Sequence, residues 1–396
     1  MALARMGAGD FGTRDGGRMI RNPETHAARL AAARALVDTV LIPAEARMDA
    51  EDRLPDEARA ALRAHGLFGI SIPETHGGLG LTMEEEAELM LVLGRAAPGF
   101  RAVYALNSGG AAQILLRAGT EAQKRRWLPW LASGERIACF CLSEPGAGSD
   151  AAALATTARR DGDGWVLDGH KRWVTNAPEA GMLMVMARTG GEGARGISAF
   201  ALDPATPGVH VLPDQPKMGM RSARVADILF EKARIPADAL VGAEGEGLKL
   251  ALAGLDKVRL HLAALSAGLM ERLIEEGRAH ALRRTQFGRP LAEQPAIMAL
   301  LADSAAEALA ARCMALELAR ARDEGRLRPA EAAAAKLFAT EALGRVADRV
   351  LQAHGGEGYM QGSAVERLYR DARVLRILDG TSEIQRLVVA RGLLSA

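Results

Sequence analysis

The segment ERIACFCLSEPGAGSDAAA, residues 135–153, marks the point where the pattern of the sequence changes. Before it, apolar residues recur every three or four positions, as they do along one face of a helix. Within and after it, short runs rich in valine, isoleucine and aromatic residues are separated by glycine, aspartate and proline, which is typical of strands joined by turns. The segment therefore predicts a boundary between a helical domain and a β domain.

Residues 23–134 are expected to form an N-terminal helical domain. Segments with the helical period include ETHAARLAAARALVDTV (24–40), PDEARAALRAHG (55–66) and TMEEEAELMLVLGRAA (82–97). Thr82, followed three residues later by Glu85, has the spacing of a capping box that starts a helix. Residues 1–22 lack the apolar core of a secretory signal, so we expect them to form a flexible tail.

Residues 135–245 are expected to form a central antiparallel β domain, because the strand-like runs follow one another without intervening helices. The helical period then returns and holds to the end of the chain. Residues 248–284 predict one long amphipathic helix, and further Ala/Leu-rich helices with short breaks follow it. The predicted fold class is therefore α+β multidomain, with a C-terminal helical bundle over residues 246–396.

The composition argues against several classes of protein. Of the 396 residues, 49% are hydrophobic and 25% are charged, which is typical of a soluble globular protein with a large core. The net charge of +1 argues against nucleic-acid binding, and charged residues interrupt each apolar stretch before it reaches membrane-spanning length. Cys139, Cys141 and Cys313 have neither a disulfide framework nor metal-ligand spacing, so we expect a cytoplasmic protein without a metal site.

The loop from Ser143 to Asp150, which follows the first predicted strand, is a weak functional signal by itself. Its small residues allow backbone N–H groups to approach an anion, and Ser149 offers a hydroxyl group. An ordinary turn after a strand is the simpler explanation of the same residues. The loop gains meaning only together with other segments of the chain.

The loop resembles the Ser/Thr-Glu-Pro-x-x-Gly-Ser-Asp core of the acyl-CoA dehydrogenase family, and other segments resemble further motifs of that family in the same order. These segments are GHKRWVTNA (169–177), PKMGMRSARVADILFEKARIP (216–236), RRTQFGRPLAEQ (283–294), QAHGGEGYMQGSAVERLYRDAR (352–373) and ILDGTSEIQRLVVARG (377–392). The resemblance covers residues 23–396. It implies an N-terminal helical domain, a central β domain and a C-terminal four-helix bundle, in agreement with the periods above.

The resemblance also implies non-covalently bound FAD in a protein that is typically a homotetramer. The positions that match FAD contacts are Phe140, Leu142, Ser143, Gly148, Ser149, Trp173, Val174, Thr175, Arg284, Gln286, Phe287, Gln294, Gln352, Gly355, Gly356, Thr381 and Glu383. Five of these match positions that reach the FAD of a neighbouring subunit: Arg284, Gln286, Gln352, Gly355 and Gly356. Without the resemblance, Trp173 would be taken as a core tryptophan and Arg284 as a solvated charge at a helix end.

The reaction that the resemblance implies is the α,β-dehydrogenation of an acyl-CoA thioester. Asp379 matches the base that removes the α proton while the β hydrogen leaves as hydride to flavin N5, and electrons then pass to an electron-transferring flavoprotein. An acyl carrier protein could replace coenzyme A as the carrier of the acyl group. The positions that match substrate contacts are Ser149, Asp256, Arg259 and Gly380. Arg259 fits a salt bridge within the bundle equally well.

The chain departs from the family pattern at several positions. Most relatives with a base here have glutamate, whereas Asp379 is shorter by one methylene, or about 1.5 Å. Val258 occupies the position of a second base used by isovaleryl-type relatives, so Asp379 is the only carboxylate that the motifs place as a base. Pro295 replaces a glutamine that contacts FAD, with Gln294 beside it as a substitute, and Gly362 replaces an acidic or amide residue.

Three alternatives stay open at this point. The segment DGTSE, residues 379–383, also fits a turn and helix cap with a solvated Asp379. An oxidase or monooxygenase on the same scaffold would keep the flavin but let oxygen reach it. A protein with a vestigial site would bind an acyl thioester without reacting. If Asp379 is the base, its shorter side chain favours a short, branched or cyclic acyl group.

Overall fold

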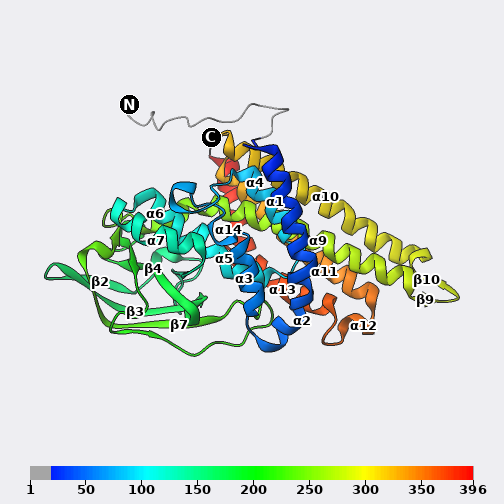
Figure 1. The fold of residues 1–396 in the computed structure, drawn as a ribbon, viewed down its shortest axis with the longest axis horizontal. Helices are drawn as coiled ribbons and strands as arrows, with labels where there is room; N and C mark the ends of the chain where they lie inside the picture. Colours follow the sequence, from blue (N-terminus) through cyan, green and yellow to red (C-terminus); the bar gives the residue numbers. More distant parts are fainter. Residues whose placement is uncertain (1–18, 396) are drawn as a thin grey trace.

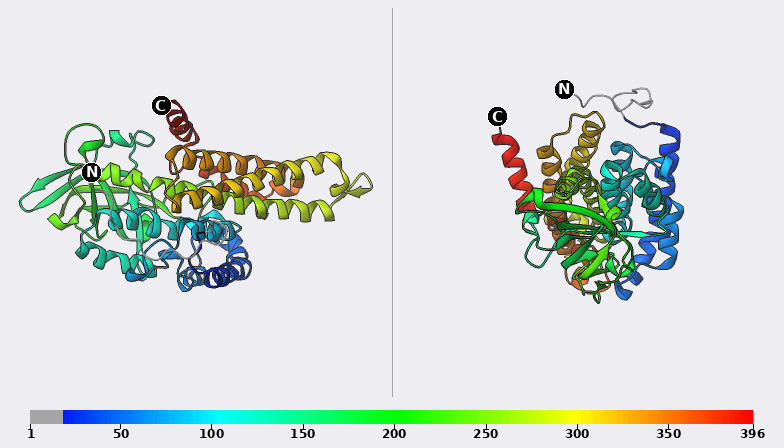
Figure 2. Two further views of the ribbon diagram at one scale, coloured as in Figure 1. Left: turned by 90° about the horizontal axis from the view of Figure 1, so that it is seen from above. Right: turned by 90° about the vertical axis from the view of Figure 1, so that its left-hand side faces the viewer.

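The computed structural model describes residues 19–395, which form three regions in sequence order (Figure 1). A β region lies at one end of the molecule, long helices extend to the other end, and the N-terminal helices pack beside them (Figure 2). Most of the predicted tail, residues 1–18, lies outside the described residues. Its last residues are anchored, because the backbone N–H of Met19 donates to a carboxylate oxygen of Glu84 at 2.5 Å.

The N-terminal region is helical, as predicted. Its helices are α1 (Pro23–Leu36), α2 (Ile42–Glu51), α3 (Asp56–Ala64), α4 (Met83–Leu93), α5 (Pro98–Leu106), α6 (Ala112–Ala118) and α7 (Glu121–Ser133). The predicted capping box at the start of α4 is confirmed. The Thr82 hydroxyl accepts from the Glu85 N–H at 3.2 Å, and the Glu85 carboxylate accepts from the Thr82 N–H at 2.9 Å.

The central region is a sheet that begins just after the predicted change at Glu135. Its strands are β1 (Ile137–Cys141), β2 (Thr157–Asp161), β3 (Gly164–Thr175), β4 (Ala180–Arg188), β5 (Ile197–Leu202), β6 (Val209–Val211), β7 (Val225–Ile235) and β8 (Leu240–Val241). The strand order is β6-β7-β3-β2-β4-β5-β8, with β1 beside β4. Most pairs are antiparallel, as predicted, but β1 and β2 each run parallel to β4. The chain between β1 and β4, which contains β2 and β3, is long enough for such a return.

The C-terminal region is helical, as predicted, with one difference in its first element. Its elements are α8 (Gly247–Ala253), α9 (Leu255–Arg283), the hairpin β9 (Thr285–Gln286) and β10 (Arg289–Pro290), α10 (Pro295–Asp323), α11 (Pro329–His354), α12 (Gly356–Tyr359), α13 (Ala364–Arg373) and α14 (Ser382–Leu394). The single helix expected over residues 248–284 is divided at Gly254, a residue type that weakens a helix interior. Helices α9, α10 and α11 pack side by side, and α13 and α14 lie against α11.

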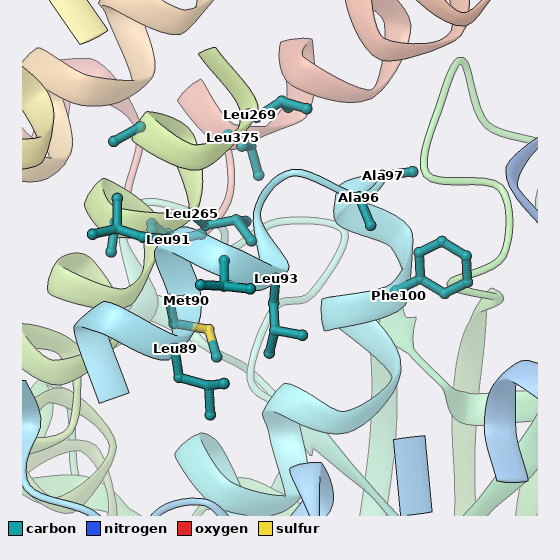
Figure 3. Close-up of a cluster of buried hydrophobic side chains, with 14 of the residues drawn as sticks. Leu89, Met90, Leu91, Leu93, Ala96, Ala97, Phe100, Leu265, Leu269 and Leu375 are labelled. Carbon is teal, nitrogen blue, oxygen red and sulfur yellow. The ribbon is translucent and has the colours of Figure 1, made fainter. Parts of the chain in front are cut away.

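Helix α4 joins the N-terminal region to the C-terminal bundle by packing closely on α9 (Figure 3). Leu91 of α4 and Leu265 of α9 belong to one buried apolar cluster. The approach requires glycine on both sides. A Cβ atom at Gly268 would lie 2.1 Å from the Leu91 carbonyl oxygen, and one at Gly94 would lie 2.4 Å from the Leu265 carbonyl oxygen. Within residues 19–395, no helix combines the length and the apolar character needed to span a membrane.

A buried charged cluster reinforces the same contact between helices. Glu86 of α4 accepts from Lys257 Nζ at 2.7 Å and is 2.6 Å from His261 Nε2, both on α9. Burial disfavours the ionised carboxyl group, but Lys257 and His261 outweigh burial and lower the pKa of Glu86 to about 2. The carboxylate is therefore ionised at neutral pH and balances the charge of Lys257, whereas burial lowers the pKa of His261, whose ring serves as a hydrogen-bond partner.

We expect Glu86→Gln to destabilise the protein by about 3–5 kcal/mol at pH 7, because Lys257 loses its buried counter-charge. The pKa of Glu86 in the folded protein is below its ordinary value of 4.5, so its contribution is present above pH 4.5 and is lost as the pH falls towards 2. Urea unfolding followed by circular dichroism between pH 3 and 7 measures both effects. The control is Glu275→Gln, which breaks the exposed ion pair of Glu275 with Arg95 and should cost less than about 1 kcal/mol. Equal costs for the two variants would contradict the role of the buried cluster.

Candidate active site

Asp379 lies in the connection that leads into α14, and this connection has an uncommon backbone. Asp379 and Gly380 both have left-handed conformations, with φ of 53° and 90°. The hydroxyl of Thr381 accepts from the Ile384 N–H at 3.3 Å and so caps α14. Since Thr381 supplies the cap, the carboxylate of Asp379 has no capping role.

Two side chains hold this connection by its carbonyl oxygens. Lys336 Nζ, from α11, donates to the Gly380 carbonyl oxygen at 2.9 Å. Gln385 Nε2 donates to the same oxygen at 2.9 Å and to the Asp379 carbonyl oxygen at 3.3 Å. The fit is tight, because a Cβ atom at Gly380 would lie 2.6 Å from Gln385 Nε2. Both Lys336 and Gln385 are fully buried. Sequence reasoning missed both, although a lysine on the alanine-rich face of α11 is a recognisable signal.

The groups of Asp379 that could act on a ligand are left free by this arrangement. Neither its carboxylate nor its backbone N–H has a hydrogen bond or a close ion pair with any residue from 19 to 395. Asp379 is exposed to solvent in the single chain, yet enough protein surrounds its carboxyl group for desolvation to raise its pKa. The two properties together indicate a carboxylate that a ligand can reach and that protein atoms partly surround.

Three cations on different helices lie near enough to Asp379 to change the pKa of its carboxyl group. The charges of Arg101, Lys336 and Arg259 each lower the pKa of Asp379 and partly offset its desolvation. Burial in turn lowers the pKa of Lys336 to about 8, against the opposing effect of Asp379. A carboxyl group whose pKa is raised towards neutrality while it stays near cations has the properties of a general base.

The predicted substrate contacts on α9 lie in the same neighbourhood. Arg259 donates to Asp256 at 2.7 Å, so the helix salt bridge that the sequence left open is present. Arg259 is buried, its Nε has no partner among the described residues, and its charge acts on Asp379, so the salt bridge does not exclude a ligand contact. Val258 is half-buried and faces Gly109, which leaves no carboxylate at the alternative base position.

The predicted flavin contacts on the β region form an accessible face. Along β1, Cys139 and Cys141 are fully buried in the sheet core, whereas the alternate residues Phe140 and Leu142 keep accessible surface. Trp173 is 57% exposed and has φ of 55°, so it is not the core tryptophan that the bare sequence suggested. The backbone N–H of Trp173 donates to Asp227 Oδ1 at 3.1 Å. A strained, exposed tryptophan of this kind is typical of a ligand site.

Other predicted residues of this region divide between the core and the surface. The side chain of Val174 is buried in the sheet core, so only its backbone is available to a ligand. Glu144, at the start of the loop, is buried and accepts from Lys171 Nζ at 2.6 Å and from the Thr156 N–H at 3.0 Å. This anchor fixes the loop, whose small residues Gly148 and Ser149 are exposed. Ser143 and Thr175 are half-buried beside them.

A second group of predicted flavin contacts lies at the opposite end of the molecule. Arg284, Gln286 and Phe287 belong to the β9–β10 hairpin region, far from β2, β3 and β7 in Figure 1. Gln294 donates to the Gln286 carbonyl oxygen at 3.2 Å, and Gln352, Gly355 and Gly356 lie at the exposed end of α11. Phe287 is 95% exposed and has φ of 52°. One chain therefore cannot bring both groups of residues to the same ligand.

Two departures from the expected pattern have local explanations. Pro295 is the first residue of α10, where its fixed φ suits a helix start and its missing N–H costs nothing. Gly362 has φ of 94°, a conformation that glycine adopts readily and that other residues rarely adopt. Thr381 and Glu383, the remaining predicted contacts, lie in the cap and first turn of α14.

Comparisons with known proteins point to one family along nearly the whole described chain. Models for the N-terminal, middle and C-terminal domains of acyl-CoA dehydrogenase match residues 23–135, 139–233 and 245–394. The short-chain specific mitochondrial acyl-CoA dehydrogenase of Bos taurus is 39% identical over 375 residues, covering 94% of this chain and 91% of its own. The structure of butyryl-CoA dehydrogenase from Megasphaera elsdenii has a TM-score of 0.90 and 30% identity, covering 94% of this chain and 99% of its own. A prolyl acyl carrier protein oxidase has the same TM-score, identity and coverage.

The hydrogen bonds from Lys336 and Gln385 to the connection that contains Asp379 form a clamp on it. This clamp predicts that Gly380→Ala lowers the free energy of unfolding substantially. The substitution adds left-handed strain and also displaces Gln385, so we expect a loss of about 2–3 kcal/mol in unfolding free energy. The matched control is Gly325→Ala in the turn after α10, where φ is 71° but no atom lies within 4 Å of a Cβ. It should cost about 1 kcal/mol, from strain alone. Urea unfolding of both variants tests this, and equal costs would mean that Gln385 does not hold the connection.

Proposed function

The chain belongs to the acyl-CoA dehydrogenase family of FAD-dependent oxidoreductases, and from that premise we propose that it removes one hydrogen each from the α and β carbons of an acyl thioester. Asp379 is the base for the α proton. The observation that carries this proposal is the free, accessible carboxylate of Asp379, on a connection that Lys336 and Gln385 fix in place.

The residues of the β region fit an FAD ring system. The exposed indole of Trp173 offers a flat apolar surface beside the accessible side chains of Phe140 and Leu142. The exposed Gly148 and Ser149 leave room for phosphate groups to approach the backbone. When bound, FAD supplies the acceptor for the hydride that leaves the β carbon.

Asp379 acts on the thioester in two ways. Its carboxylate takes the α proton, and the raised pKa brings its basicity closer to that needed at neutral pH. Its free backbone N–H supports a second role, the donation of a hydrogen bond to the thioester oxygen as negative charge develops there. Gly380 has no side chain, so only its backbone would face the thioester, and Gln385 fills the position that its Cβ would take.

The two separated groups of flavin contacts support an assembly of several copies. Apolar side chains are exposed around the hairpin end of the bundle, at Leu282, Phe287, Met298, Tyr359 and Met360. Solvated apolar residues gathered in this way are typical of a contact surface between proteins. The proposal is that this end of one chain completes the FAD site of another within a homotetramer.

Coenzyme A is the proposed carrier of the acyl group, and an electron-transferring flavoprotein is the proposed electron acceptor. The likeness to a prolyl acyl carrier protein oxidase favours one competing function, an oxidase that acts on a carrier-bound acyl group. Stopped-flow mixing of reduced, product-bound protein with oxygen separates the two. Reoxidation that is slow compared with turnover supports the dehydrogenase, and rapid reoxidation supports the oxidase.

The decisive experiment on the proposed reaction uses Asp379→Ala. The purified variant should keep the yellow colour of FAD but should lose anaerobic bleaching by acyl-CoA esters by about 100- to 10,000-fold, because no base remains for the α proton. Absorbance near 450 nm, followed over a panel of esters, measures this. Asp303→Ala, which removes an exposed aspartate on α10, is the control and should bleach like the parent. Equal bleaching by parent and Asp379→Ala would show that another group is the base.

The proposed shared site predicts that Arg284→Ala weakens FAD retention and assembly together. The guanidinium group of Arg284 has no hydrogen bond or ion pair with residues 19–395, so it is available to an anionic group of a neighbouring site. Gel filtration with absorbance and light-scattering detection measures FAD content and mass. Arg283→Ala removes the same charge from the adjacent exposed residue and should change neither quantity. If both variants behave alike, Arg284 is only a solvated charge at a helix end.

A further inference from the structure

Arg101 is a buried cation without a partner. It lies on α5, only 9% of its surface is accessible, and its Nε is fully shielded without a hydrogen bond. No carboxylate within residues 19–395 forms an ion pair with it. Burial lowers the pKa of Arg101, and the charge of Asp379 opposes that effect, but a guanidinium group stays protonated in proteins.

The other buried cations of the described chain differ from Arg101, because each has a bonded or paired oxygen. These pairs are Lys171 with Glu144, Lys257 with Glu86, Arg259 with Asp256, Arg272 with Glu276, Arg367 with Glu45, and Lys336 with the Gly380 carbonyl. A desolvated charge without a partner is destabilising, so a fold rarely keeps one unless a ligand uses it.

Tyr104 supplies a second unpaired group in the same place. It lies one turn after Arg101 on α5, is 1% accessible, and its hydroxyl has no hydrogen-bond partner among the described residues. The two side chains interact electrostatically, and burial raises the pKa of Tyr104, so its hydroxyl remains a donor. A buried guanidinium and a buried hydroxyl that interact electrostatically and both lack an acceptor supply the donors of a site for an anion.

The position of this pair relates it to the base. Of the cations that lower the pKa of Asp379, Arg101 has the largest effect, yet the two residues do not form an ion pair. His261 also lies within electrostatic reach of Arg101, but its nearby carboxylate Glu86 is already bonded to Lys257 and His261. Arg101 is therefore close enough to the proposed catalytic carboxylate for their charges to interact, but it forms no ion pair with it.

We propose that Arg101 and Tyr104 bind a carboxylate at the far end of a short acyl chain, so that the substrate is a thioester of a short dicarboxylic acid. This inference rests on the proposed function. The α C–H bond gives its proton to Asp379, the β C–H bond gives its hydrogen and electron pair to the bound FAD, and a carbon–carbon double bond forms. The thioester and the distant carboxylate are unchanged. The ligand supplies the anion that Arg101 lacks, in a bidentate contact that also orients the chain.

The test compares glutaryl-CoA with valeryl-CoA, which have five-carbon acyl groups that differ in a terminal carboxylate. Anaerobic bleaching of the parent should have the higher kcat/KM for glutaryl-CoA. Arg101→Met should lower the ratio of the two kcat/KM values by about 100-fold or more, and Tyr104→Phe by about 2- to 10-fold. Arg95→Met removes an arginine that is paired with Glu275 and should leave the ratio unchanged.

A binding measurement decides the question without turnover. In the Asp379→Ala background, calorimetry should give tighter binding of glutaryl-CoA than of valeryl-CoA, and Arg101→Met should abolish the difference. The thermal midpoint of Arg101→Met should equal or exceed that of the parent, since the variant loses an unpaired buried charge. A folded Arg101→Met protein with an unaltered preference for glutaryl-CoA would overturn the proposal.

A role for Arg101 as a modifier of Asp379 alone gives a different result. The loss of Arg101 would then raise the pKa of Asp379 and move the acid limb of the pH profile of kcat/KM to higher pH for both esters. The ratio of the two kcat/KM values would stay constant. That outcome overturns the substrate assignment but not the proposed reaction. If no ester bleaches the flavin, the proposed reaction fails, and equal affinities in calorimetry would overturn the Arg101 inference separately.

Discussion

The hydrogen bond from the buried ammonium group of Lys336 to the Gly380 carbonyl oxygen is the contact on which the geometry of the site depends. Two consecutive left-handed residues have weak conformational preferences of their own, so outside donors must fix them. Lys336 comes from the N-terminal third of α11, so its hydrogen bond ties the Asp379 connection to the bundle and not merely to its neighbours in the sequence. Because the clamp uses only carbonyl oxygens, the carboxylate and N–H of Asp379 stay free.

The distribution of buried charge distinguishes structural from functional residues in this protein. Glu86 balances Lys257 and is hydrogen-bonded to His261 where α4 meets α9, and Glu144 with Lys171 anchors the loop after β1. These groups are saturated by their neighbours and have no capacity left for a ligand. Asp379 and Arg101 are the opposite case, since neither has a bonded partner: Arg101 is buried, and Asp379 is accessible although the surrounding protein raises its pKa. Unsatisfied charge is thus concentrated around the proposed acyl site.

Much of the fold could be predicted from the sequence, because its signals are local. The capping box at Thr82 and the change of period at Glu135 need only a few neighbouring residues, and both agree with the structure. The parallel pairing of β1 with β4 and the division of the long helix at Gly254 were missed. The first depends on how distant segments return. The second depends on Gly254, and an isolated glycine is often tolerated inside one continuous helix.

The candidate site was only partly accessible to sequence reasoning. The motif containing Asp379 predicted a base, but it could not reveal the hydrogen bonds from Lys336 and Gln385 or the unpaired Arg101. In a sequence, a lysine or arginine on a helix is ordinarily a solvated residue, and only packing shows that it is buried. Trp173 illustrates the reverse error, since composition suggests a core residue and the structure exposes it.

The placement of the two groups of flavin contacts at opposite ends of the chain has a genetic consequence in the proposed assembly. An alteration of Trp173 and an alteration of Arg284 would damage different halves of each shared pocket. When two such defective chains pair, one pocket receives both faults and the other receives none. Co-expression of two inactive alleles would therefore restore one intact centre in each mixed pair, the behaviour known as intragenic complementation.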